Sequence, residues 1–216
     1  MKKSALFLFL CLNCSMAQAI EPMTCRNVFF PEKQNVLQLA TVKLEKGEKL
    51  YFYSDEESCP EKASCKQKAY LIPNDTVIVN NVTDGWACAW YQGKKRETVG
   101  WLKADKLEFK TPSETKWTGK WTFYSNTLNI KNSKGSIQVS GEAFWQGAMV
   151  NGEPNVHTGS IDGELKMNRN HATVSEGEDE YSCHADLTLL DNYLMVSDNN
   201  NCGGANVSFT GVYTRK

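Results

Sequence analysis

Few residues in this sequence have types and spacings that could carry out catalysis. The chain of 216 residues contains three histidines, His157, His171 and His184, and each stands apart from any nucleophile motif. No serine occupies a G-x-S-x-G elbow, and neither an HExxH pair nor a glycine-rich phosphate loop is present. Cys183 directly precedes His184, but adjacent residues of a strand point to opposite faces, so the pair does not bring a nucleophile to a base. We therefore expect no catalytic residues and a protein that is not an enzyme.

The sequence also lacks the spacing of a metal site. The acidic run from Glu176 to Glu180 could suggest calcium, but it lacks the alternating oxygen ligands of a calcium loop. A solvated turn is favoured there, because like charges stay apart most easily in water. The cysteines expected in the mature chain contain no C-x2-C pair, and no histidine is suitably spaced for zinc. We expect neither a metal nor a cofactor.

The first nineteen residues have the pattern of a secretory signal peptide. Two lysines near the start are followed by an apolar run from Ala5 to Leu12, and Ala17-Gln18-Ala19 matches a small-x-small cleavage pattern. The apolar run is shorter than the ~20 residues that span a bilayer. We expect removal of residues 1–19 by cleavage after Ala19. The mature chain would then be periplasmic or secreted and would have no transmembrane segment.

Disulfide bonds are the expected chemistry of the cysteines, because an even number of cysteines in an exported chain predicts a disulfide framework. If the chain forms two separately cross-linked domains, Cys183 pairs with Cys202. Among the other four, Cys59 and Cys65 lie in one polar segment and could close a small loop. Cys25 would then pair with Cys88, and the two alternative pairings of these four cysteines remain open. The six cysteines after the leader are Cys25, Cys59, Cys65, Cys88, Cys183 and Cys202.

The charge balance argues against a nucleic acid partner. Lysine and arginine number 24 and aspartate and glutamate number 25, which gives a formal net charge of -1. No global basic field is therefore available to attract phosphates. The apolar and aromatic content is too high for a disordered chain, and the length allows one or two domains. The oligomeric state is left open.

Short strands separated by turns are the main pattern of the first half. Runs of β-branched and aromatic residues alternate with turn compositions rich in glycine, proline, asparagine and aspartate. Such strands at this spacing predict a small barrel within residues 20–110. The predicted strands are 36–44, 50–53, 69–71, 76–80, 86–91 and 98–102.

A polar stretch at 111–116 has no periodic apolar residues, which predicts a linker to a second domain at 117–216. That second domain shows alternation again, and about eight antiparallel strands in it predict a closed barrel or a tight sandwich. The expected fold class is therefore all-β, with a small barrel followed by a second antiparallel barrel or sandwich. The predicted strands are 117–124, 128–130, 136–146, 159–167, 172–175, 181–190, 193–197 and 206–213.

A succession of short motifs in the first half is similar to a known family. The strings are Leu50-Tyr51-Phe52-Tyr53, Asp84-Gly85-Trp86 and Gly100-Trp101-Leu102. On these strings, the region of about residues 38–109 resembles the bacterial SH3 domain of the SH3b type, found in exported and cell-wall-associated proteins. The resemblance implies an SH3-like small barrel and a noncatalytic module that recognises peptidoglycan or a peptide. An insert that holds two cysteines departs from the family pattern, and residues 117–216 resemble no family of known function.

Aromatic residues are the candidate ligand contacts of this module. Tyr51, Tyr53 and Tyr91 can each offer an apolar face to a ligand while the hydroxyl stays hydrated. Trp86 and Trp101 each follow a glycine at the start of a strand, which favours a place at the ends of the barrel core. Trp101 is nevertheless kept among the candidate ligand residues.

Three functions follow as hypotheses. The leading one is a noncatalytic cell-envelope binding protein whose SH3b-like module engages peptidoglycan or a peptide. The alternative is a proteinaceous inhibitor in the periplasm, for example of lysozyme, because small disulfide-linked β domains suit that task. In the third, the C-terminal barrel carries a small ligand.

Overall fold

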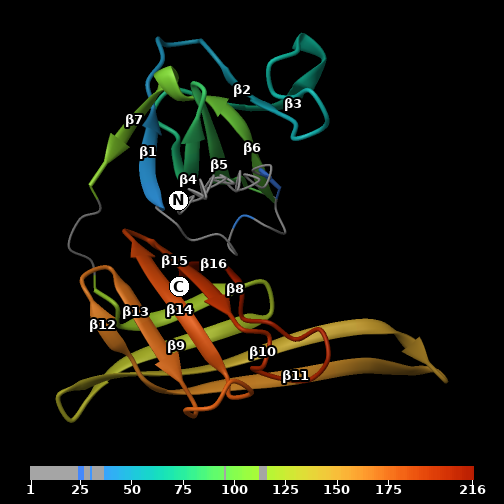
Figure 1. The fold of residues 1–216 in the computed structure, drawn as a ribbon, viewed down its shortest axis with the longest axis vertical. Coiled ribbons are helices and arrows are strands. Elements are labelled where there is room, and N and C mark those ends of the chain that lie inside the picture. The colour runs from blue at the N-terminus through green and yellow to red at the C-terminus, as the bar shows by residue number, and fades with distance from the viewer. Residues whose placement is uncertain (1–23, 27–29, 31–36, 95, 112–115) are drawn as a thin grey trace, which may run out of the picture.

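The computed structural model describes residues 24–26, 30, 37–94, 96–111 and 116–216. The predicted leader and its cleavage site lie outside the described residues, and so does most of the predicted linker, residues 112–115. Within the described ranges, no helix is long and apolar enough to cross a membrane. The fold is all-β, as predicted, and its strands form two antiparallel sheets of seven and nine strands (Figure 1).

The first sheet contains the predicted strands of the first half and one more. Its strand order is β3-β2-β6-β5-β4-β1-β7. The added strand β7 pairs with β1 and has only one buried residue, Leu107, so its sequence lacks a clear apolar signal. Two 3-10 turns, η1 (Ala63–Cys65) and η2 (Ala104–Lys106), lie between strands. The strands are β1 (Gln38–Val42), β2 (Leu50–Tyr53), β3 (Lys66–Leu71), β4 (Thr76–Thr83), β5 (Trp86–Gln92), β6 (Glu97–Lys103) and β7 (Leu107–Lys110).

The second sheet has nine strands because one predicted strand is divided. The predicted strand 159–167 is interrupted at the buried residue Leu165, where β11 ends and β12 begins. The order is β11-β10-β9-β8-β16-β15-β14-β13-β12, so the first strand of this half pairs with its last. The strands are β8 (Gly119–Phe123), β9 (Asn126–Ser133), β10 (Ser136–Val150), β11 (Glu153–Glu164), β12 (Lys166–Asn168), β13 (His171–Ser175), β14 (His184–Leu190), β15 (Tyr193–Asp198) and β16 (Gly211–Arg215).

The second sheet curls towards itself. β11 and β12 are its two edge strands, and Leu165 alone separates them along the chain, so the two edges lie close to one another. The loop after Cys202 also meets the edge strand, because Gly159 and Gly203 form an isolated antiparallel bridge. Large side chains fill the interior of the curl, including Trp121, Phe209 and Tyr213. Their burial supplies the main hydrophobic stabilisation of this half.

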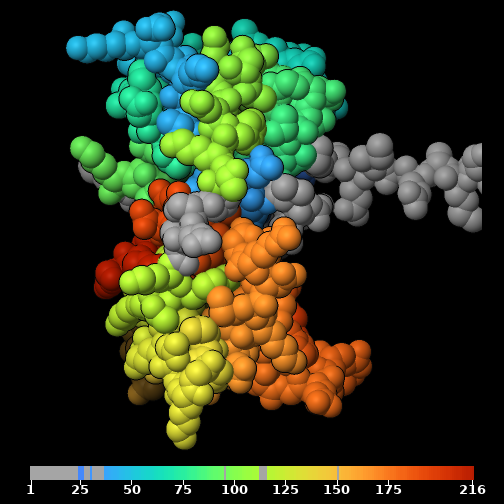
Figure 2. All heavy atoms as spheres, turned by 90° about the vertical axis from the view of Figure 1, so that its left-hand side faces the viewer, coloured from blue at the N-terminus to red at the C-terminus, as the bar shows by residue number. Residues whose placement is uncertain are grey.

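The two sheets are joined by an apolar cluster that we call the inter-sheet core. In β14 and β15, Leu189 and Leu194 belong to the interior of the curl, whereas the adjacent Leu190 and Met195 pack against the first sheet. Both faces of these strands are therefore buried, and the halves stack directly on one another (Figure 2). The buried members of the inter-sheet core are Cys25, Phe30, Leu37, Leu39, Ile78, Trp86, Cys88, Trp90, Trp101, Leu190, Met195 and Val212.

The six cysteines form three disulfides, in the pairing that their spacing in the sequence favoured. They join Cys25 to Cys88, Cys59 to Cys65 and Cys183 to Cys202. The first anchors the N-terminal segment to β5 inside the inter-sheet core. Such a framework indicates an oxidising, extracytoplasmic environment.

Candidate functional site

A pocket of about 340 Å³ opens beside two tryptophans of the first sheet. Trp86 begins β5 directly after the Asp84-Gly85 turn, where both residues have positive φ. Trp101 of β6 pairs with Cys88, two residues after Trp86, so both indoles lie on one face of the sheet. We call this site the Trp86–Trp101 pocket. It is lined by Asp55, Ser58, Cys59, Pro60, Glu61, Thr83, Asp84, Trp86 and Trp101.

Asp55 forms a fixed wall of this pocket. Its carboxylate accepts hydrogen bonds from Trp101 Nε1 at 2.9 Å and from Arg26 Nε at 3.1 Å. Arg26 Nη2 also donates to the backbone carbonyl of Asp55 at 3.0 Å. Charge-assisted hydrogen bonds of this kind hold a carboxylate in one orientation. Asp55 is therefore a partner-bound structural anion rather than a free base.

The remaining acids of the pocket are exposed. Glu61 and Asp84 are both exposed, and neither forms an ion pair with a described residue. The Asp84 carboxylate accepts a hydrogen bond from Thr83 Oγ1 at 3.4 Å. Because that donor is neutral, it does not compensate the charge of Asp84. The mouth of the pocket thus carries negative charge above an aromatic floor.

The indole of Trp86 already contacts a cation. Lys103 lies opposite Trp86 across β5 and β6, and its Nζ stands 3.6 Å from the ring centroid. Tyr53 meets the same indole nearly edge-on, with centroids 4.8 Å apart. An ammonium group over an indole face is attracted by the negative face of the ring. Lys103 thus already places a positive charge on this face of Trp86.

The structure separates the four predicted ligand residues. Trp101 lines the pocket, and Tyr53 stands next to it, because Tyr53 pairs with Trp101 across β2 and β6 and packs edge-on against Trp86. Tyr51 lies opposite Tyr70 near the sheet edge, outside the pocket. The Tyr91 hydroxyl donates to Asp75 Oδ1 at 3.3 Å, away from the pocket. Burial and the nearby negative charge of Asp75 raise the pKa of Tyr91.

The carboxylates of the pocket were not predicted as site residues. Asp84 stands in the Asp84-Gly85-Trp86 string, so its place beside an indole had a sequence signal. Asp55 and Glu61 had none, because their approach depends on the loop closed by the Cys59–Cys65 disulfide. Within the described residues, no group of three or more potential ligand side chains could hold a metal ion.

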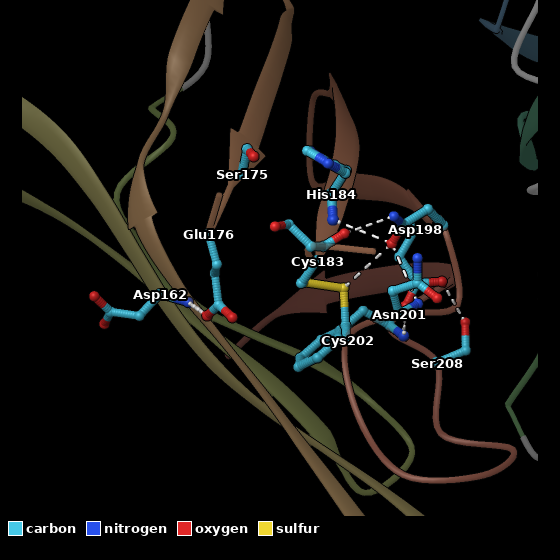
Figure 3. Close-up of a disulfide and its surroundings, with 12 residues drawn as sticks. Asp162, Ser175, Glu176, Cys183, His184, Asp198, Asn201, Cys202 and Ser208 are labelled. Atoms are coloured by element: carbon cyan, nitrogen blue, oxygen red, sulfur yellow. Dashed lines mark hydrogen bonds between the residues drawn. A yellow bond between two sulfur atoms is a disulfide. The ribbon is translucent and has the colours of Figure 1, made fainter. Parts of the chain in front are cut away.

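Polar residues at the end of β15 and in the loop before β16 form a hydrogen-bonded framework. Asp198 accepts bonds from Ser208 Oγ at 2.6 Å, from Thr210 Oγ1 at 2.8 Å and from the N–H of Phe209 at 2.9 Å. In Figure 3, Asp198 and Ser208 lie beside the Cys183–Cys202 disulfide. These contacts hold the loop before β16 in place.

The acidic run is an exposed, ordered turn. Asp179 accepts bonds from the Oγ of Ser182 and from the N–H groups of Tyr181 and Ser182. The hydrogen bond from the Ser182 hydroxyl and that from the Tyr181 N–H lower the pKa of Asp179. Glu176 instead accepts from the N–H of Asp162 at 2.6 Å (Figure 3).

A second, open cleft of about 550 Å³ lies beside the same disulfide. Phe144 and Glu142 border it on β10, and Glu176 borders it from the turn after β13. Its residues belong to strand edges and to the framework just described, so the cleft shows no convergent set of reactive groups. The Trp86–Trp101 pocket is the stronger candidate site.

Comparison with protein-family models, curated proteins and solved structures gave no match to this chain.

Proposed function

We propose that this protein is an exported, noncatalytic binding protein of the cell envelope. Its first half acts as an SH3b-like module that engages a peptide, either the stem peptide of peptidoglycan or a peptide segment of another protein. The Trp86–Trp101 pocket receives a cationic group of that peptide. The observation that carries this proposal is the combination of an aromatic floor with exposed carboxylates at the mouth.

Three features of the pocket support a cationic ligand group. The exposed carboxylates of Glu61 and Asp84 attract positive charge, and Trp86 and Trp101 add an aromatic lining beside them. The Asp55 carboxylate is held by Arg26 and Trp101, so the wall is organised before a ligand arrives. A preorganised site loses less entropy on binding.

Co-sedimentation with purified peptidoglycan sacculi tests the proposal. The oxidised protein, residues 20–216, should pellet saturably, and Glu61→Lys should weaken pelleting at least fivefold. Glu153→Lys makes the same charge change at an exposed position of β11 and should have no effect. A synthetic lysine-containing peptide should compete with sacculi. Equal losses in both variants, or no competition, would overturn the assignment of the pocket. No pelleting and no peptide binding by a folded protein would overturn the function.

A second candidate function is inhibition of an enzyme, favoured by the shape of the β10–β11 hairpin. β10 pairs with β9 only as far as Glu142, whereas its pairing with β11 continues to Val150, so the end of the hairpin projects as a two-stranded ribbon (Figure 1). Phe144, Met149 and Val156 are exposed on it. Exposed apolar groups on a projecting element suit a protein contact. Titration of lysozyme with the protein should then show stoichiometric inhibition that Met149→Ser weakens, and unchanged lysozyme activity would exclude that target.

A further inference from the structure

Two tyrosines and two lysines form a continuous ladder across β2 and β3. Tyr51 pairs directly with Tyr70 across the strands, and their ring centroids are 5.7 Å apart. Lys66 Nζ stands 3.7 Å from the Tyr51 ring centroid, and Lys49 Nζ stands 4.1 Å from that of Tyr70. The order across the surface is therefore Lys49, Tyr70, Tyr51, Lys66. We call this surface the Lys–Tyr ladder.

A third ammonium group belongs to the same surface. Lys66, Lys68 and Tyr70 alternate along β3 and are all exposed, so they share one face of this edge strand. Within the described part of the chain, no carboxylate lies within ion-pair distance of Lys49, Lys66 or Lys68. The ladder thus presents three positive charges that no described acid neutralises, although the whole chain has a formal charge of -1.

The tyrosines hold two of these charges in place. A cation over an exposed aromatic ring is attracted by the negative face of the ring, which favours the stacked position of a flexible lysine. Lysine side chains otherwise lose considerable rotamer entropy when they bind a ligand. Prior ordering by Tyr51 and Tyr70 reduces that cost. A plain solvated row of lysines would lack this ordering.

We propose that the Lys–Tyr ladder binds a linear acidic polysaccharide. Repeated carboxylates along the polymer match the row of ammonium groups, and the tyrosine hydroxyls offer hydrogen bonds to sugar hydroxyls. The three disulfides indicate an extracytoplasmic setting, where anionic glycans are among the polyanions that a protein meets. This surface shares no residue with the Trp86–Trp101 pocket, so the inference does not rest on the proposed peptide function.

Fluorescence anisotropy with a labelled alginate hexasaccharide tests the proposal. The oxidised protein, residues 20–216, should bind it, with affinity that falls as salt rises, because ions screen exposed charges. Maltohexaose, which is neutral, should not compete. Lys66→Gln/Lys68→Gln should weaken binding at least tenfold, and Tyr70→Ala should weaken it at least threefold. The matched control Lys120→Gln/Lys131→Gln removes two exposed lysines of the second half and should change binding less than twofold.

Several outcomes would overturn the proposal. Equal losses in both lysine pairs would show diffuse attraction rather than a site. Tight alginate binding that Tyr70→Ala does not weaken would show that the tyrosines do not order the lysine side chains for binding. A single-stranded oligothymidine of similar charge that binds as tightly as alginate would exclude specificity for glycans. Absence of alginate binding by folded protein would exclude the site itself, whatever the result with sacculi.

Discussion

The rings of Trp90 and Tyr193 meet edge to face, with centroids 5.6 Å apart, and so connect the first sheet to the second. Trp90 Nε1 also donates to Glu97 at 3.0 Å, and partial burial together with the nearby charge of Glu97 raises the pKa of the Tyr124 hydroxyl of the second half. Aromatic and polar contacts thus surround the inter-sheet core. Trp86 and Trp101 belong to that same core, so the pocket they line lies against the packing between the two sheets.

Charge placed in the inter-sheet core should destabilise the whole protein. Met195 is fully buried between the sheets, so Met195→Glu should cost about 3 kcal/mol or more, because a buried carboxylate there has no partner. Met167→Glu makes the same change at an exposed position of β12 and should alter stability by less than about 0.5 kcal/mol. Urea unfolding followed by tryptophan fluorescence measures both. Equal stability of the two variants would contradict a shared core.

The contact between β11 and the loop after Cys202 should require a glycine at position 159. A Cβ built on Gly159 would lie 2.2 Å from the carbonyl oxygen of Cys202, and backbone cannot yield as a flexible side chain can. We expect Gly159→Ala to cost roughly 1–3 kcal/mol, as overpacking does. At Gly204 the nearest atom is a side-chain carbon of His157 at 3.3 Å, so Gly204→Ala should be much milder. Thermal unfolding distinguishes the two, and a larger effect at Gly204 would refute the close approach.

The disulfides should differ in their contribution to stability. Cys25 and Cys88 are 63 residues apart, and Cys59 and Cys65 only 6. Loop-closure entropy then predicts losses of about 4 and about 2 kcal/mol for the respective double alanine variants. Denaturant titration gives both values. A larger loss for the short loop would show that it contributes mainly through native contacts at the pocket.

Stability should fall at alkaline pH through Tyr213. Burial raises the pKa of this hydroxyl well above its usual value of 10.0, and the hydroxyl donates to the Phe209 carbonyl at 2.9 Å. The unfolded chain releases the proton first as pH rises above 10, so the stabilisation present below that pH is progressively lost above it. The stability difference between the wild type and Tyr213→Phe should therefore shrink between pH 8 and pH 11. A constant difference in urea unfolding would argue that Tyr213 ionises equally in both states.

Strand positions could be predicted because turn residues and alternation mark them directly. The Asp84-Gly85 turn, for example, adopts the positive φ values that its residues favour, and β5 follows at once. The disulfide pairing could also be predicted, because four cysteines lie in the first half and two in the second, which limits the partners of each. These are local signals, and they need no knowledge of tertiary contacts.

The contact between the sheets and the acidic mouth of the pocket could not be obtained in this way. Leu189 and Leu190 are adjacent apolar residues that serve different cores, and a continuous apolar run does not say what covers each face. Glu61 reaches the pocket only because a disulfide loop places it there. Both features depend on long-range packing.

The burial of Phe30 has a consequence for the order in which the protein can mature. Phe30 is completely enclosed among residues that include Val212, so almost the entire chain separates two partners in one core. During synthesis from the N-terminus, Phe30 emerges early and Val212 emerges near the end. Until β16 has been synthesised, the residues that the first half contributes to the inter-sheet core therefore lack part of their packing partners. A chaperone that shields this surface would act during that interval.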